Sequence, residues 1–139
     1  MLKKVVLITG TSSGIGLHAS ISLARAGHTV IATMRNLAKR GALDTAARAA
    51  NVELDVAPLD ITDPDSVRSA VSDAASRHAR IDVLVNNAGV AHVGTLESLS
   101  DRALRDCFES NFFGVARVTR EVLPLMRAAG RGHIVAVTS

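Results

Sequence analysis

The 139-residue sequence is long enough for one domain, and its core must consist mainly of aliphatic residues, because tryptophan and tyrosine are absent. The formal net charge is only +3 and the basic residues are scattered, which argues against nucleic-acid binding. The single cysteine, Cys107, excludes a disulfide within the chain, and no apolar run is long enough to span a membrane. The N-terminus lacks a signal-peptide pattern, so we expect a cytoplasmic protein. The histidines show no metal-ligand spacing, and no metal site is predicted.

The first predicted elements are a strand, a glycine-rich turn and a helix. Val5–Ile8 is an apolar, β-branched run, typical of a parallel strand covered on both faces, and helical spacing starts at Leu17. Glycines let the backbone approach a ligand closely, while the helix directs unpaired N–H groups and a positive dipole end to the same place. This arrangement predicts a pyrophosphate site, with a glycine turn that binds nothing as the alternative. The residues predicted to bind the cofactor here are Gly10, Ser12, Ser13, Gly14, Ile15 and Gly16.

Two motifs resemble those of one enzyme family. The turn reads Thr-Gly-x-x-x-Gly-Ile-Gly over residues 9–16, which resembles the glycine motif of the short-chain dehydrogenase/reductase family. Asn-Asn-Ala-Gly at residues 86–89, directly after an apolar strand predicted at residues 81–85, is the second resemblance. Asparagine side chains can tie adjacent strand ends together, and a small residue followed by glycine leaves room for a ribose and nicotinamide. The cofactor contacts that the resemblance implies here are Asn87, Ala88 and Gly89.

The second predicted strand, residues 29–33, is followed by a basic residue and not by an acidic one. In an NAD site, an acidic residue about twenty residues past the glycines binds the ribose 2′-hydroxyl. Arg35 lies in this region, and a guanidinium offers charged donors to a 2′-phosphate. Ser12 and Ser13 could add hydroxyl donors. The sequence therefore favours NADP(H) over NAD(H), with a solvated arginine at a strand end as the alternative.

The middle of the chain continues to alternate between predicted helices and strands. Residues 37–50 favour a helix, residues 52–59 a third strand, and Asp63-Pro64 is a typical helix start. Asp60 and Ile61, at the end of that strand, resemble the family's acidic and apolar pair that contacts the adenine ring. Without the family, Asp60 would be interpreted as a simple turn residue.

The last part of the chain predicts a long helix and a fifth strand. The helix begins at Ser100-Asp101 and extends to about Met126, with Pro124 kinking or shortening its end. Asn111 resembles the family's Asn-x-x-Gly asparagine, which helps to hold a water in a proton relay; a solvated helix residue is the alternative. Ser139, at the end of the strand over residues 133–139, matches the serine that binds the substrate oxygen in the family.

Strands and helices in alternation predict an α/β fold: a Rossmann-type, doubly wound parallel sheet of order 3-2-1-4-5, in a single domain over residues 1–139. The resemblance covers the front part of the family fold, without its C-terminal strands. It implies an NADP-dependent oxidoreductase that acts on a small carbonyl or alcohol substrate. The residues of its motifs are most similar to those of hydroxysteroid and retinol dehydrogenases.

The family's proton donor is the tyrosine of a Tyr-x-x-x-Lys motif, and this chain contains no tyrosine. We therefore expect the chain to be inactive alone, and the complete protein to form a homo-oligomer. The alternative function is a non-catalytic dinucleotide-binding module, such as a sensor or a pseudoenzyme.

Overall fold

The structure, a computed structural model, describes residues 2–138 and contains a parallel sheet in the order β3-β2-β1-β4-β5, as predicted. The strands are β1 (Val5–Ile8), β2 (Thr29–Met34), β3 (Asp55–Pro58), β4 (Val83–Asn86) and β5 (His133–Ala136). The α-helices are α1 (Gly14–Arg25), α2 (Gly41–Ala50), α3 (Pro64–His78), α4 (Asp101–Phe108) and α5 (Val115–Ala128). A 3-10 turn, η1 (Leu37–Lys39), precedes α2, and a π-helical turn, η2 (Glu109–Gly114), joins α4 to α5.

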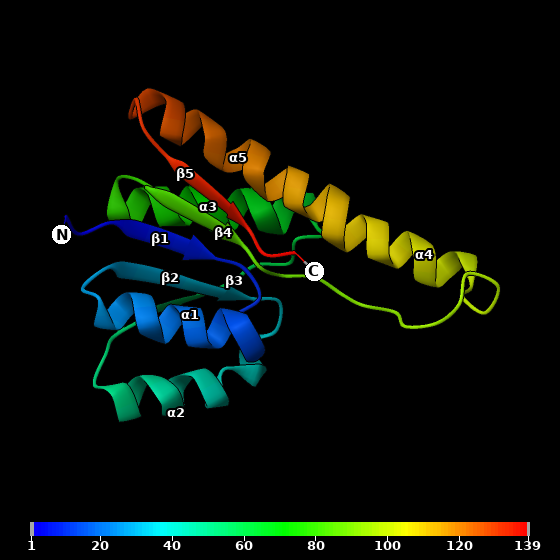
Figure 1. The fold of residues 1–139 in the computed structure, drawn as a ribbon. Coiled ribbons are helices and arrows are strands. Elements are labelled where there is room, and N and C mark those ends of the chain that lie inside the picture. The colour runs from blue at the N-terminus through cyan, green and yellow to red at the C-terminus, as the bar shows by residue number, and fades with distance from the viewer. Residues whose placement is uncertain (1, 139) are drawn as a thin grey trace.

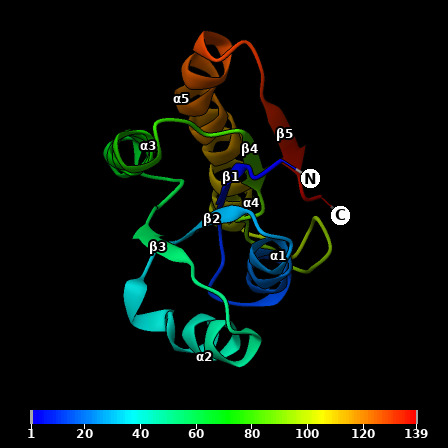
Figure 2. The ribbon, with the colours of Figure 1, turned by 90° about the vertical axis from the view of Figure 1, so that its left-hand side faces the viewer.

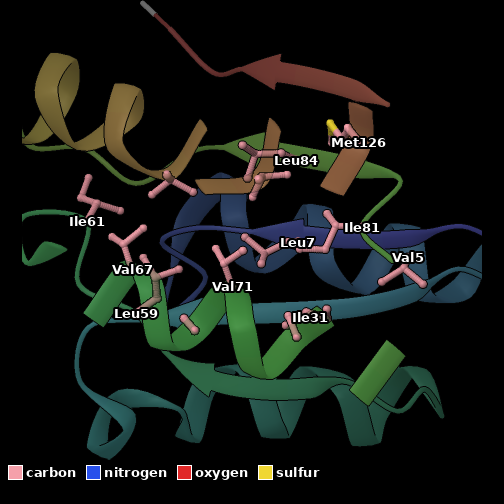
Figure 3. Close-up of a cluster of buried hydrophobic side chains, with 14 residues drawn as sticks. Val5, Leu7, Ile31, Leu59, Ile61, Val67, Val71, Ile81, Leu84 and Met126 are labelled. Carbon is pink, nitrogen blue, oxygen red and sulfur yellow. The ribbon is translucent and has the colours of Figure 1, made fainter. Parts of the chain in front are cut away.

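Helices cover both faces of the sheet. The end-on view shows α1 and α2 on one side of the strands and α3 and α5 on the other (Figure 2). Because side chains alternate along a strand, Val6 and Ile8 of β1 join the cluster with α1 and α2, while Leu7 joins the opposite cluster. In that second cluster Leu7 points toward Val67 and Val71 of α3 (Figure 3). Two buried layers therefore explain why β1 is apolar throughout.

The observed boundaries of helices and strands differ from the predicted ones where local polar groups compete with regular structure. The helix predicted over residues 37–50 is divided, because Asn36 Oδ1 accepts a hydrogen bond from Ala38 N at 2.9 Å and starts η1. The third strand is shorter than predicted, because pairing with β2 runs only from Asp55 to Pro58. The fourth is displaced to Val83–Asn86, since Asp82 turns its carboxylate to the backbone N–H of Val5 at 2.8 Å.

Two predicted helix starts are confirmed. Asp63 Oδ1 accepts a hydrogen bond from Asp65 N at 2.9 Å, with Pro64 as the first residue of α3. Ser100 Oγ accepts one from Ala103 N at 3.2 Å at the start of α4. Both side chains pair a first-turn N–H group that has no partner within its helix.

The helix predicted over residues 100–126 is interrupted, and it ends later than predicted. The π-helical turn η2 interrupts it, and α5 passes Pro124 and ends only at Ala128. Figure 1 shows α4 extending beyond the sheet, and no residue of α4 is buried. Within residues 2–138, no helix combines the length and the apolar character that a membrane span requires.

Candidate functional site

A cleft of about 340 Å³ lies at the carboxyl ends of the strands, the edge to which all strand arrowheads point in Figure 1. The segments that follow β1, β2, β3 and β4 contribute to it, together with η2. It therefore includes the place where the sheet order reverses, between β1 and β4, which is the usual ligand position in such sheets. Its lining residues are Gly10, Ser12, Ser13, Met34, Arg35, Leu59, Asp60, Ile61, Thr62, Asn87, Ala88, Gly89, Val90 and Ser110.

The glycines of the turn after β1 meet different structural requirements. Gly10 has a φ of 71°, and a Cβ there would lie 2.7 Å from the Cα of Ala88. A Cβ on Gly16 would collide with the carbonyl of Gly10 and the side-chain amide of Asn87. Gly14 has a φ of 58° and no atom within 4 Å of its Cβ position. Gly10 and Gly16 therefore allow close packing of the turn, whereas Gly14 leaves the backbone accessible.

The N-terminus of α1 is chemically suited to an anion. Ser13 precedes the helix in an extended conformation, and its hydroxyl makes no capping hydrogen bond. The first turn of α1 also contains no acidic residue. Its N–H groups therefore lack the usual side-chain acceptors, and a phosphate oxygen is the kind of acceptor that such groups bind. This end of α1, which follows the lining residues Ser12 and Ser13, therefore has the chemistry of an anion site.

A network between the ends of β1 and β4 holds the centre of the cleft. The hydroxyl oxygen of Thr9 accepts hydrogen bonds from the backbone N–H groups of Asn87, at 3.0 Å, and Ala88, at 2.9 Å. In return, Nδ2 of Asn87 donates to the carbonyls of Thr9, at 3.0 Å, and Gly10, at 2.9 Å. The prediction that an asparagine ties these strand ends together is confirmed, and Thr9 is the partner that the sequence analysis missed.

The charged side chains in the cleft lining are Arg35 and Asp60. Arg35 follows the last residue of β2, is exposed, and shares the lining with Ser12 and Ser13. Among the residues that the structure describes, no ion pair engages its guanidinium. One end of the cleft thus combines a cation with two hydroxyl groups, a donor set that suits a phosphate monoester.

Asp60 is held by the loop that follows β3. Its Oδ1 accepts hydrogen bonds from both the backbone N–H of Thr62, at 2.9 Å, and the Thr62 hydroxyl, at 2.7 Å. Its own N–H donates to Ser66 Oγ at 2.9 Å. Since both internal bonds use Oδ1, the second carboxylate oxygen, Oδ2, retains its capacity to accept a hydrogen bond from a ligand.

The π-helical turn η2 forms another part of the cleft wall. Ser110, only 9% exposed, lines the cleft, whereas the neighbouring Asn111 does not. Asn111 instead binds the backbone of Val90, accepting from its N–H at 2.9 Å and donating to its carbonyl at 2.8 Å. It therefore holds the loop after β4 against η2, and it is exposed to solvent without lining the cleft.

Most of the predicted cofactor residues meet at this cleft, but their role as ligands stays a prediction. Gly14, Ile15, Gly16 and Asn111 are outside the lining, and Ser139 lies outside the described residues. The lining residues that were not predicted as site residues are Met34, Leu59, Thr62, Val90 and Ser110. Within residues 2–138, no cluster of three or more histidine, cysteine or acidic side chains could hold a metal ion.

Comparison with known proteins gives consistent matches. A family model described as short chain dehydrogenase matches residues 4–139. Retinol dehydrogenase 8 of Bos taurus is 46% identical over 140 residues, covering 98% of this chain but 44% of the relative. The human 17-beta-hydroxysteroid dehydrogenase type 1 is 39% identical over 145 residues, covering 100% of this chain and 44% of the relative. The chain thus spans about half the length of the curated relatives it matches.

A solved structure shows the same arrangement in three dimensions. A variant of the actinorhodin polyketide ketoreductase with NADPH superposes with a TM-score of 0.92 at 34% identity. The match covers 99% of this chain and 53% of the ketoreductase.

Proposed function

The chain belongs to the short-chain dehydrogenase family, and on this premise we propose that it binds NADP(H) for hydride transfer to or from a small carbonyl or alcohol substrate. The observation that carries the proposal is the exposed Arg35, a residue with a charged guanidinium that lines the same cleft as Ser12 and Ser13. A 2′-phosphate would accept charge-assisted hydrogen bonds from this group. The solved relative with NADPH supports the same cofactor.

The other cleft residues would each bind a different part of the cofactor. The turn at Gly10 and the N-terminus of α1 would bind the diphosphate, Asp60 and Ile61 the adenine ring, and Ala88 and Gly89 the nicotinamide ribose. When bound, NADP(H) would supply the hydride chemistry, while the chain binds and orients it.

Asn111 and Ser139 are the two residues that we propose for catalysis. Asn111 would act through the Val90 segment that it holds. In the family the serine matched by Ser139 binds the substrate oxygen, and we propose the same role for it here.

Replacing Arg35 with alanine tests the cofactor assignment. We expect NADPH affinity to fall about tenfold or more, because hydrogen bonds to a charged group contribute about 1.5–3 kcal/mol and about 1.4 kcal/mol changes affinity tenfold. NADH affinity should stay unchanged, since NADH lacks the 2′-phosphate. Fluorescence titration of the purified chain with each nucleotide measures both.

The matched control is Arg25→Ala, which removes the same charge from the opposite end of α1. That variant should bind NADPH like the unmodified chain. Equal NADPH affinities in Arg35→Ala and the unmodified chain would remove Arg35 from the site and, with it, the stated reason for preferring NADP(H).

A non-catalytic dinucleotide-binding module is the second candidate function, and the tyrosine that donates the proton in the family does not occur among these 139 residues. Without that proton donor, we expect these residues alone to show no NADPH-dependent carbonyl reduction above a protein-free control. NADPH oxidation followed at saturating carbonyl compound measures this, and turnover well above the control would contradict it. A Tyr-x-x-x-Lys motif in the coding sequence after Ser139 would favour the oxidoreductase.

Self-association stays a prediction. Phe108, Phe112 and Phe113 are more than half exposed along α4 and η2, with exposed fractions of 61%, 61% and 51%. Exposed aromatic surface of this kind is commonly buried by contact with another protein surface.

A further inference from the structure

Arg117 of α5 joins three segments around the cleft without lining it. Its side chain is 23% exposed. Nη1 donates a hydrogen bond to the carbonyl of Ile61 at 2.5 Å, and Nη2 donates to Oε1 of Glu109 at 2.8 Å. The loop after β3, the turn η2 and the helix α5 are therefore fixed to one another by a single guanidinium.

The bond to Ile61 acts on a peptide group that also controls Asp60. The carbonyl of Ile61 and the N–H of Thr62 belong to the same planar peptide unit. Arg117 holds the carbonyl of this unit, while Oδ1 of Asp60 accepts from its N–H at 2.9 Å. Rotation of this peptide would therefore break one of the two contacts that engage Oδ1 and leave the Thr62 hydroxyl alone to hold it, so the orientation of the carboxylate, and with it of Oδ2, would be less fixed.

Packing of η2 against the loop brings Arg117 within reach. A Cβ on Gly114 would lie 2.9 Å from Cδ1 of Ile61, so the glycine lets the backbone of η2 approach the loop directly. Glu109, at the start of η2, then fixes the planar guanidinium by an ion pair. A lysine could not reproduce this arrangement, because its ammonium is a point charge without the forked geometry.

We propose that Arg117 is a positioning residue for adenine recognition: through the Ile61–Thr62 peptide it holds the Asp60 carboxylate ready to accept from the exocyclic amino group of adenine. This inference rests on the proposed NADP(H) site and deepens it. It assigns a function in cofactor selection to a side chain that does not line the cleft.

The experiment compares NADPH with its deamino analogue, reduced nicotinamide hypoxanthine dinucleotide phosphate, which lacks that amino group. The unmodified chain should prefer NADPH about tenfold, a difference typical of one hydrogen bond to a charged group. Arg117→Met should reduce this preference to about twofold or less by weakening NADPH binding alone. Arg117→Lys should give an intermediate preference, and Arg120→Met, an exposed position on the same helix, should retain the full preference.

The possible outcomes separate this inference from the proposed function. Failure of the unmodified chain to bind NADPH would overturn both. If it binds both nucleotides equally well, or if Arg117→Met weakens both to the same extent, the inference is wrong while the proposed function stands. Thermal denaturation of each variant identifies a folding defect. If Arg117→Met does not fold, Arg117→Lys decides, and a preference equal to that of the unmodified chain overturns the inference.

Discussion

Replacing Gly10 with alanine should destabilise the protein by about 2–5 kcal/mol and weaken NADPH binding. The φ of 71° costs a residue with a side chain about 1–2 kcal/mol. The added methyl would also lie 2.7 Å from the Cα of Ala88, and such overpacking costs about 1–3 kcal/mol. Because backbone cannot rotate away as a side chain can, β1 and β4 must separate at the centre of the cleft. Denaturant titration and NADPH titration measure the two effects.

Gly27→Ala is the matched control for this experiment. Gly27 has a φ of 88°, has no atom within 4 Å of its Cβ position, and lies after the C-terminal end of α1. Alanine there should cost only the conformational strain of about 1–2 kcal/mol and leave NADPH binding unchanged. If the two variants lose the same stability and bind NADPH equally well, close approach at Gly10 has no part in forming the cleft.

Sheet order and the position of the cleft could be predicted because each candidate motif directly follows an apolar strand. Gly10, Arg35, Asp60 and Asn87 come after successive strands, and the carboxyl ends of parallel strands lie at one edge of the sheet. Those residues therefore had to lie near one another once the strand order was known. Local sequence was sufficient for the helix caps as well, since each cap acts within a few residues.

Contacts between distant segments could not be predicted in this way. The bond between Asn111 and Val90 joins residues 21 apart, and nothing in the loop sequence marks Val90 as its partner. The π-helical turn ends at Gly114, which lies close against Ile61, and helical periodicity does not contain this contact between distant residues. Ser110 was missed for the same reason, because it lines the cleft from within this turn.

Replacing Thr9 with valine should lower the free energy of unfolding by about 2–4 kcal/mol, although the two side chains have nearly the same shape. Thr9 is 1% exposed, and its hydroxyl oxygen accepts from the backbone N–H groups of Asn87 and Ala88. Valine would leave both part-buried donors without this acceptor; a fully buried unsatisfied donor costs about 1–3 kcal/mol, so the lower part of the range for two donors applies. Since Ala88 lines the cleft, NADPH affinity should fall in the same variant.

Thr9→Ser separates the hydroxyl from the methyl group. Serine retains the acceptor and loses one methyl, so it should cost about 1 kcal/mol and preserve NADPH binding. A valine variant as stable as the serine variant would show that the two N–H groups find other acceptors when the hydroxyl is lost. In that case the ends of β1 and β4 would be held mainly by the Asn87 side chain, whose Nδ2 donates to the carbonyls of Thr9 and Gly10. Removal of that amide in Asn87→Ala, and not loss of the hydroxyl, would then open the cleft.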